Sequence, residues 1–234
     1  MSIKGILFDK DGTLLDFHAT WMPAYESAAA MVCERARRPG LESHLLAVGG
    51  YDAALARCDP GSLLACGTTA ELARLWAREA GMADAGALEA MLEEVFQREV
   101  GGKAVPVPEL PALFRRLKER GLALGIATMD SEALARSAAR QFGIEPYLSF
   151  VCGYDSGFGE KPGPGMAEAF CRHVALAPGD IVVVGDTPHD LHMGRAAGAG
   201  LVIGVLSGAS THEILAPHSD RVLDSVRALE ELLV

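Results

Sequence analysis

Hydrophobic and polar positions change their spacing along the chain. A short apolar run, Gly5-Ile6-Leu7-Phe8, has the length and composition of a buried parallel strand and stops at the acidic Asp9. From about residue 20 to residue 102, apolar side chains recur at helical spacing, as in 70–79 and 87–100, with almost no strand pattern. We therefore predict one strand followed by a helical stretch.

Beyond the stiff connector Val105-Pro106-Val107-Pro108, strand and helix patterns alternate. The predicted strands are 122–127, about 150–152, 181–184 and 201–205, and the predicted helices are 110–120, one from a cap at Asp130 or Ser131 to 142, 164–174, 191–197 and a final one ending at 232. Such alternation implies a parallel sheet with helices on both faces. The predicted fold class is α/β, a Rossmann-like core of residues 1–17 and 104–234 with a smaller all-helical insert, 18–103, after the first strand.

Composition and charge narrow the class of protein. The chain of 234 residues has a net charge of −10 and no block of Lys and Arg, so a nucleic-acid partner is not expected. Its five cysteines form no close pair, which favours free thiols in a reducing cytosol. The longest uncharged stretch, 196–211, is broken by four glycines and does not have the pattern of a membrane span. We expect a soluble, cytoplasmic monomer or homodimer with no membrane partner.

Polar side chains follow the predicted strands, where ligands bind in an open parallel sheet. They are Asp9 and Asp11 after the first strand, Thr128 after the second, and Asp186 and Asp190 after the strand 181–184, with Lys161 on a loop before a helix. Carboxylate oxygens are ligands for Mg²⁺, and a lysine and a hydroxyl suit a phosphate. Without a cation, clustered carboxylates would repel one another and some would keep protons. The pattern predicts a site for a hard cation and a phosphate.

The same residues carry a family resemblance. Asp9-Lys10-Asp11-Gly12-Thr13 resembles the D-x-D-G-T motif of haloacid dehalogenase-like phosphatases, and Thr128, Lys161 and the segment 185–190 resemble their second, third and fourth motifs in order. The insert after the first motif is similar to the helical cap of phosphoglycolate phosphatase-like members. Lys10 and Met129 depart from the usual pattern, which affects substrate and electrostatics rather than the type of reaction.

The resemblance implies a hydrolase, a Mg²⁺-dependent phosphatase that acts on a small phosphomonoester such as phosphoglycolate through an aspartyl phosphate. It implies that Asp9 is the nucleophile and Asp11 the general acid and base, and that Thr128 and Lys161 bind the phosphoryl oxygens. The metal ligands would be the side chains of Asp9 and Asp186 and the backbone carbonyl of Asp11. Asp190 would orient Lys161 or a metal-bound water. The cap would then close over the site and select the leaving group.

Several alternatives stay open at this point. A sugar-phosphate mutase of the same family keeps both aspartates of the first motif, and a non-catalytic binding or regulatory member would keep the fold without turnover. Asp190 could instead cap the helix that begins near residue 191. A metal or substrate role for His18, His189 and His192 also stays open, as does a substrate-reading role for the segments 49–51 and 67–69.

Overall fold

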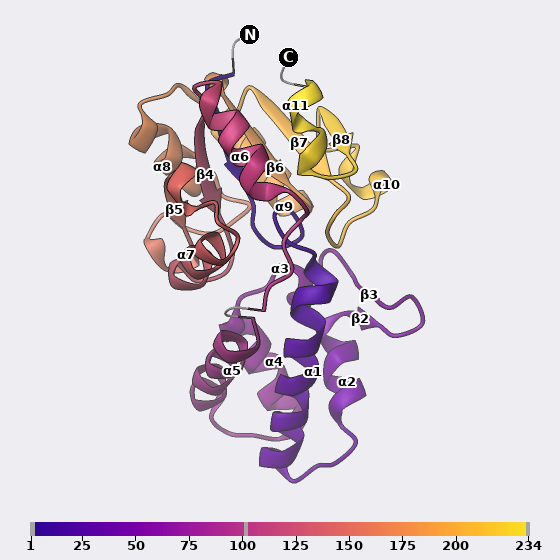
Figure 1. Cartoon of the computed structure of the whole chain (residues 1–234). Helices are drawn as coiled ribbons and strands as arrows, with labels where there is room; N and C mark the ends of the chain where they lie inside the picture. Colours follow the sequence, from indigo (N-terminus) through magenta and orange to yellow (C-terminus); the bar gives the residue numbers. More distant parts are fainter. Residues whose placement is uncertain (1–2, 101–102, 233–234) are drawn as a thin grey trace. The chain divides into compact units, whose positions relative to one another are not determined.

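The structure is a computed structural model that describes residues 3–100 and 103–232 (Figure 1). Within them the chain forms two compact units. One, here named the sheet unit, comprises the chain up to Phe17 and from Val105 onward, and the other, the insert unit, comprises His18–Ala104. No helix in these described ranges is both long enough and apolar enough to cross a membrane.

The sheet unit is built on six strands that pair in parallel. They are β1 (Gly5–Phe8), β4 (Ala123–Ala127), β5 (Leu148–Cys152), β6 (Ile181–Gly185), β7 (Leu201–Val205) and β8 (Arg221–Leu223). Their order across the sheet is β5-β4-β1-β6-β7-β8, which places β1 inside the sheet between β4 and β6. The predicted α/β class with a parallel sheet is therefore confirmed.

Helices cover both faces of this sheet (Figure 1). They are α6 (Leu110–Glu119), α7 (Glu132–Gln141), α8 (Gly165–Val174), α9 (Pro188–Ala197), α10 (His212–Leu215) and α11 (Leu229–Leu232), with short 3-10 turns at Glu145–Tyr147, Tyr154–Ser156, Pro178–Asp180 and Val226–Ala228. Successive side chains of a strand point to opposite faces. Leu7 accordingly belongs to a buried cluster with Phe170 of α8 and Met193 of α9, whereas the ring of Phe8 lies 5.0 Å from that of Phe114 of α6.

Local sequence explains where these helices begin. The Ser131 hydroxyl accepts a hydrogen bond from the Leu134 N–H, so Ser131, rather than Asp130, is the N-cap of α7. Thr187 and Asp190 form a capping box at the start of α9, three residues earlier than the predicted start at 191.

The C-terminal region differs from the prediction. The final helix does end at Leu232 as predicted, but it is only the short α11, and the prediction missed α10 and the edge strand β8 that precede it. Pro217 cannot continue the helix that begins at His212. A strand of three residues is too short to show an alternating pattern, and for this reason the sequence analysis missed it.

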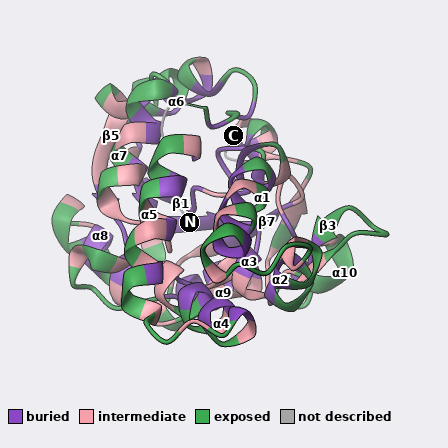
Figure 2. Cartoon of the chain, turned by 90° about the horizontal axis from the view of Figure 1, so that it is seen from below, coloured by how far each residue is buried: buried purple, intermediate pink, exposed green. Residues whose placement is uncertain are grey.

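The insert unit consists mainly of helices, as predicted for this stretch. They are α1 (Phe17–Ala36), α2 (Glu42–Gly49), α3 (Leu63–Cys66), α4 (Thr69–Ala80) and α5 (Ala85–Val100). The indole N–H of the buried Trp76 donates to the carbonyl of Leu45, which ties α4 to α2. Along α1, α2, α4 and α5, buried residues lie on one side of the helix and exposed residues on the other (Figure 2), as expected of amphipathic helices around a small core.

The insert unit is not all-helical as predicted, because it also contains a two-stranded antiparallel hairpin of β2 (Tyr51–Asp52) and β3 (Arg57–Cys58). Gly50, with a φ of 108°, ends α2 in a left-handed conformation just before the hairpin. Thr68 caps α4 through a capping box with Glu71. The segments 49–51 and 67–69 therefore end and begin helices, and a substrate-reading role for either segment remains a prediction.

Candidate active site

The site residues of the sheet unit lie where its central strands end. Phe8 pairs in register with Ile126 of β4 and with Val184 of β6, so the residues that follow these three strands lie side by side. The N–H of Asp9 donates to the Val184 carbonyl at 2.8 Å and extends the pairing by one residue. From β1 the chain continues to β4 and β5 on one side and later returns to β6 on the other. A parallel sheet forms its ligand crevice at such a switch point.

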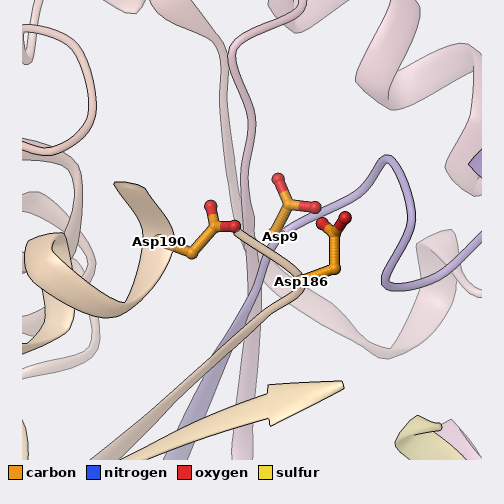
Figure 3. A group of neighbouring side chains, drawn as sticks. All are labelled: Asp9, Asp186 and Asp190. Atoms are coloured by element: carbon orange, nitrogen blue, oxygen red, sulfur yellow. The ribbon is translucent and has the colours of Figure 1, made fainter. Parts of the chain in front are cut away.

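Three buried carboxylates gather there: Asp9 from the end of β1, Asp186 from the end of β6 and Asp190 from the first turn of α9 (Figure 3). One oxygen of each lies within 4.8 Å of the others. Three residues that are far apart in the sequence are thus brought together within the range of one ion.

Lys161 supplies the positive charge of this cluster. Its Nζ donates to Oδ1 of Asp9 and to Oδ1 of Asp190, both at 2.6 Å, and its side chain is 1% exposed. Burial alone would lower the pKa of Lys161, but the carboxylates of Asp190 and Asp9 outweigh it, and the pKa lies above its usual range. Lys161 is therefore a charged residue of the site and not a solvated loop lysine.

Asp190 makes the contacts of both roles that the sequence left as alternatives. Its Oδ2 accepts hydrogen bonds from the backbone N–H and the hydroxyl of Thr187, at 3.0 and 2.7 Å, and so caps α9. Its Oδ1 accepts from Lys161. Since the capping bonds fix the carboxylate, Asp190 holds Lys161 in a defined place beside Asp9.

The loop after β7 holds Asp186, a feature that the sequence analysis missed. The Ala209 N–H donates to Oδ2 of Asp186 at 2.9 Å, and the Ser207 hydroxyl donates to the Gly12 carbonyl at 2.7 Å. A Cβ on Gly208 would lie 1.9 Å from Oδ2 of Asp186, so only glycine lets the loop pass so close. This loop follows a predicted strand, and the same strand-end rule that found Asp186 would have pointed to it.

Asp11 lies in a second network beside the cluster. Its Oδ1 accepts from Lys10 Nζ at 2.6 Å, and its Oδ2 accepts from the Thr128 hydroxyl at 3.3 Å. Its side chain is not part of the three-carboxylate group. A metal contact through its backbone carbonyl remains a prediction.

The three-carboxylate cluster fits a divalent cation. Oδ2 of Asp9 and Oδ1 of Asp186 are buried, and neither has a hydrogen-bond partner among residues 3–100 and 103–232. Burial raises the pKa of Asp9 to about 7 against the opposing effect of Lys161, and the charges of Asp190 and Asp11 add to the rise. Burial, with Asp9 and Asp190 nearby, also raises the pKa of Asp186. A cation held by these carboxylates would give Oδ1 of Asp186 a partner and would oppose the protonation of both aspartates.

The histidines do not join this cluster: in the described part of the chain, the metal-ligating group is made of aspartates alone. His18 Nε2 accepts a hydrogen bond from the Cys58 N–H in the insert unit, and His192 pairs with His218 at 3.1 Å.

This fold and this arrangement of aspartates and lysine agree with a comparison against protein families. Residues 3–198 match the model of the haloacid dehalogenase-like hydrolases. The match covers well over half of the 234 residues, so the chain belongs to this family and is a hydrolase.

Individual proteins are also similar to this chain in sequence or in fold. A phosphoglycolate phosphatase of Neisseria meningitidis serogroup A is 30% identical over 132 residues, 55% of this chain and 56% of that protein, so this alignment spans about half of either length. A phosphoglycolate phosphatase of Xylella fastidiosa is 28% identical over 213 residues, which cover 90% of this chain and 83% of that protein. The crystal structure of a HAD hydrolase of family IA, variant 3, from Entamoeba histolytica shares the fold, with a TM-score of 0.72 at 18% identity over 99% of this chain and 98% of that one.

Proposed function

We propose that this hydrolase is a Mg²⁺-dependent phosphatase that cleaves a small phosphomonoester through a phosphoaspartate on Asp9. The observation that carries the proposal is the state of the Asp9 carboxylate. Lys161 holds its Oδ1 at 2.6 Å, and its buried Oδ2 has no partner among the described residues. A nucleophile needs a fixed carboxylate with one oxygen available to the reacting atom.

The first chemical step is the attack of Asp9 on phosphorus. The bond from phosphorus to the leaving oxygen breaks as a bond from phosphorus to the Asp9 oxygen forms, and Asp11 gives the leaving alkoxide a proton. In the second step Asp11 takes a proton from the attacking water, and the phosphoaspartate is hydrolysed to phosphate. Lys161 and the Thr128 hydroxyl stabilise the negative charge of the phosphoryl oxygens.

Asp9 and Asp186 would hold the cation, and Asp190 would keep Lys161 in place beside it. When bound, Mg²⁺ neutralises charge on the phosphoryl group and lowers the repulsion between that group and the carboxylates. The carboxylate donor set supports Mg²⁺ because this ion prefers oxygen ligands and is commonly held by one or two carboxylates.

We propose phosphoglycolate as the first substrate to test and the insert unit as a cap that selects it. The support is that the Neisseria and Xylella relatives are phosphoglycolate phosphatases. The insert unit also has a packed core of its own and contains none of the four motifs. Surface residues of such a unit can differ without changing the residues proposed to react, which suits a unit that selects the substrate.

The experiment is a measurement of phosphate release from a panel of small phosphomonoesters, with p-nitrophenyl phosphate as a general substrate. We expect release with Mg²⁺ and none after treatment with EDTA, with recovery when Mg²⁺ is added back. Full activity in metal-free buffer would contradict the metal site, and the absence of any release would favour a non-catalytic member. Conversion of a hexose 1-phosphate into a hexose 6-phosphate without net release of phosphate would identify a mutase instead.

A further inference from the structure

Lys10 is the charged residue of the first motif that the proposed chemistry does not use. It stands between Asp9 and Asp11, and its side chain is 1% exposed. Its Nζ lies 2.6 Å from Oδ1 of Asp11 and 3.1 Å from Oδ2 of Asp130. A buried ammonium group is stable only when carboxylates surround it in this way.

Asp130 is the second anchor of this lysine. The Ser131 hydroxyl, and not the Asp130 carboxylate, caps α7. The Asp130 side chain is 12% exposed and accepts from the Ser131 N–H through Oδ1, which leaves Oδ2 for the ion pair with Lys10. Burial raises the pKa of Asp130 to about 6 against the opposing effect of Lys10.

The contacts close into a ring around Asp11. Lys10 bridges Asp11 and Asp130, the Asp130 N–H donates to the Thr128 hydroxyl at 3.1 Å, and that hydroxyl donates to Oδ2 of Asp11. Both oxygens of the Asp11 carboxylate are therefore held, one by an ammonium group and one by a hydroxyl. In the proposed reaction the Thr128 hydroxyl turns to a phosphoryl group, and the Lys10 ammonium still holds Oδ1 of Asp11.

We infer that Lys10, anchored by Asp130, is a positioning residue that holds Asp11 in the orientation needed for proton transfer to the leaving group. The inference rests on the proposed function, because it requires Asp11 to be the general acid and base. Proton transfer depends steeply on the geometry of the donor, so a residue that fixes the donor affects only the steps that need the proton. An ion pair that merely stabilises the fold would affect all substrates alike.

The experiment compares leaving groups in Lys10→Met, which keeps the length of the side chain and removes its charge. Rapid mixing gives the rate at which Asp9 is phosphorylated by p-nitrophenyl phosphate, whose leaving group needs no proton, and by an alkyl phosphate, whose leaving group does. We expect phosphorylation by the alkyl phosphate to slow about 10- to 100-fold, as for loss of a residue that orients a ligand. We expect phosphorylation by the aryl phosphate to stay within about threefold of the parent, because it does not use the acid.

Two comparisons separate this inference from the proposed function. Asp11→Asn should show the same selectivity to a greater degree, ~10²- to 10⁴-fold, and if it shows none the role of Asp11 itself fails. If Asp11→Asn is selective and Lys10→Met slows both substrates equally, or neither, the inference about Lys10 is overturned while the function stands. Lys4→Met removes an exposed lysine paired with Asp180 and should match the parent.

If Lys10→Met does not fold, a second variant tests whether Lys10 orients Asp11. Asp130→Asn keeps the short bond between Lys10 and Asp11 and weakens only the anchor. A smaller loss in the same direction, confined to alkyl phosphates, supports the inference. An equal loss with both substrates, or no loss with either, contradicts it.

Discussion

Lys10 and Lys161 are two buried lysines that each bridge two carboxylates, and one carboxylate of each pair comes from the first motif. Lys161 joins Asp9 to Asp190, and Lys10 joins Asp11 to Asp130. The two networks nevertheless differ in whether their carboxylate oxygens have hydrogen-bond partners. Beside Lys161, buried oxygens of Asp9 and Asp186 lack a hydrogen-bond partner among the described residues. Around Lys10, both oxygens of Asp11 are held, and Oδ2 of Asp130, which has no hydrogen-bond partner among the described residues, faces the Lys10 ammonium at 3.1 Å as an ion pair.

This difference suggests that the two otherwise similar ion-pair networks have different functions. A carboxylate cluster with one lysine and free oxygens carries excess negative charge, which suits a cation and then a phosphoryl group. A ring that holds both oxygens of one carboxylate instead fixes its orientation, as proton transfer requires. The same residue types thus serve binding in one place and geometry in the other.

The largest expected effect comes from the nucleophile. We expect Asp9→Asn to lower turnover of every phosphomonoester by at least about 10⁴-fold, because an amide neither attacks phosphorus nor balances a cation. Steady-state kinetics with fold verified by circular dichroism checks this. Asp180→Asn, at the opposite end of β6, is the matched control and should keep full activity. Activity of Asp9→Asn within tenfold of the parent would remove Asp9 from the chemistry.

The second prediction tests the comparison between the lysines directly. Lys161→Met should slow alkyl and aryl phosphates to a similar degree, ~10²- to 10³-fold, because Lys161 stabilises the phosphoryl group that all substrates share. Phosphorylation rates for both substrates, measured beside those of Lys10→Met, provide the check. Should Lys161→Met prove selective for alkyl phosphates, the two networks would share one role.

The sequence predicted the parts of this site that follow from strand ends. Asp9, Thr128 and Asp186 each come directly after an apolar run, and a parallel sheet brings such residues together. Lys161 lies on the loop before α8, so the strand-end rule does not apply to it, and its assignment rested on its positive charge and on the family motif. The partnership of Lys10 with Asp130 was not predicted, because it depends on a contact between residues 120 positions apart that no periodicity encodes. The edge strand β8 was missed because three residues show no pattern.

The third prediction concerns the loop that holds Asp186. A Cβ at position 208 would meet Oδ2 of Asp186, so Gly208→Ala should displace that carboxylate and raise the half-saturating Mg²⁺ concentration about 10-fold or more. Titration calorimetry with Mg²⁺ alone measures this without turnover. Gly179→Ala is the control, because a Cβ there meets nothing within 4 Å. Unchanged Mg²⁺ affinity in Gly208→Ala would show that Asp186 needs no support from this loop.

The smallest expected effect is a pH dependence of stability that separates the two networks. Burial raises the pKa of Asp9 from 3.8 to about 7 in the metal-free protein. The folded state then binds this proton more tightly than the unfolded state, so the resulting stabilisation is complete below about pH 4 and is lost as the pH rises to about 7. Mg²⁺ competes with that proton, and saturating Mg²⁺ should raise the Tm more at pH 8 than at pH 5, by about 3–6 °C.

Melting curves of two variants test which network binds the ion. In Asp186→Asn, the rise in Tm caused by Mg²⁺ should lose this dependence on pH, because a metal ligand is gone. Asp130→Asn should keep it, because the ring around Asp11 does not bind the ion. If Asp130→Asn abolished the dependence while Asp186→Asn preserved it, the cation would belong to the Lys10 network and the assignment of the two roles would be reversed.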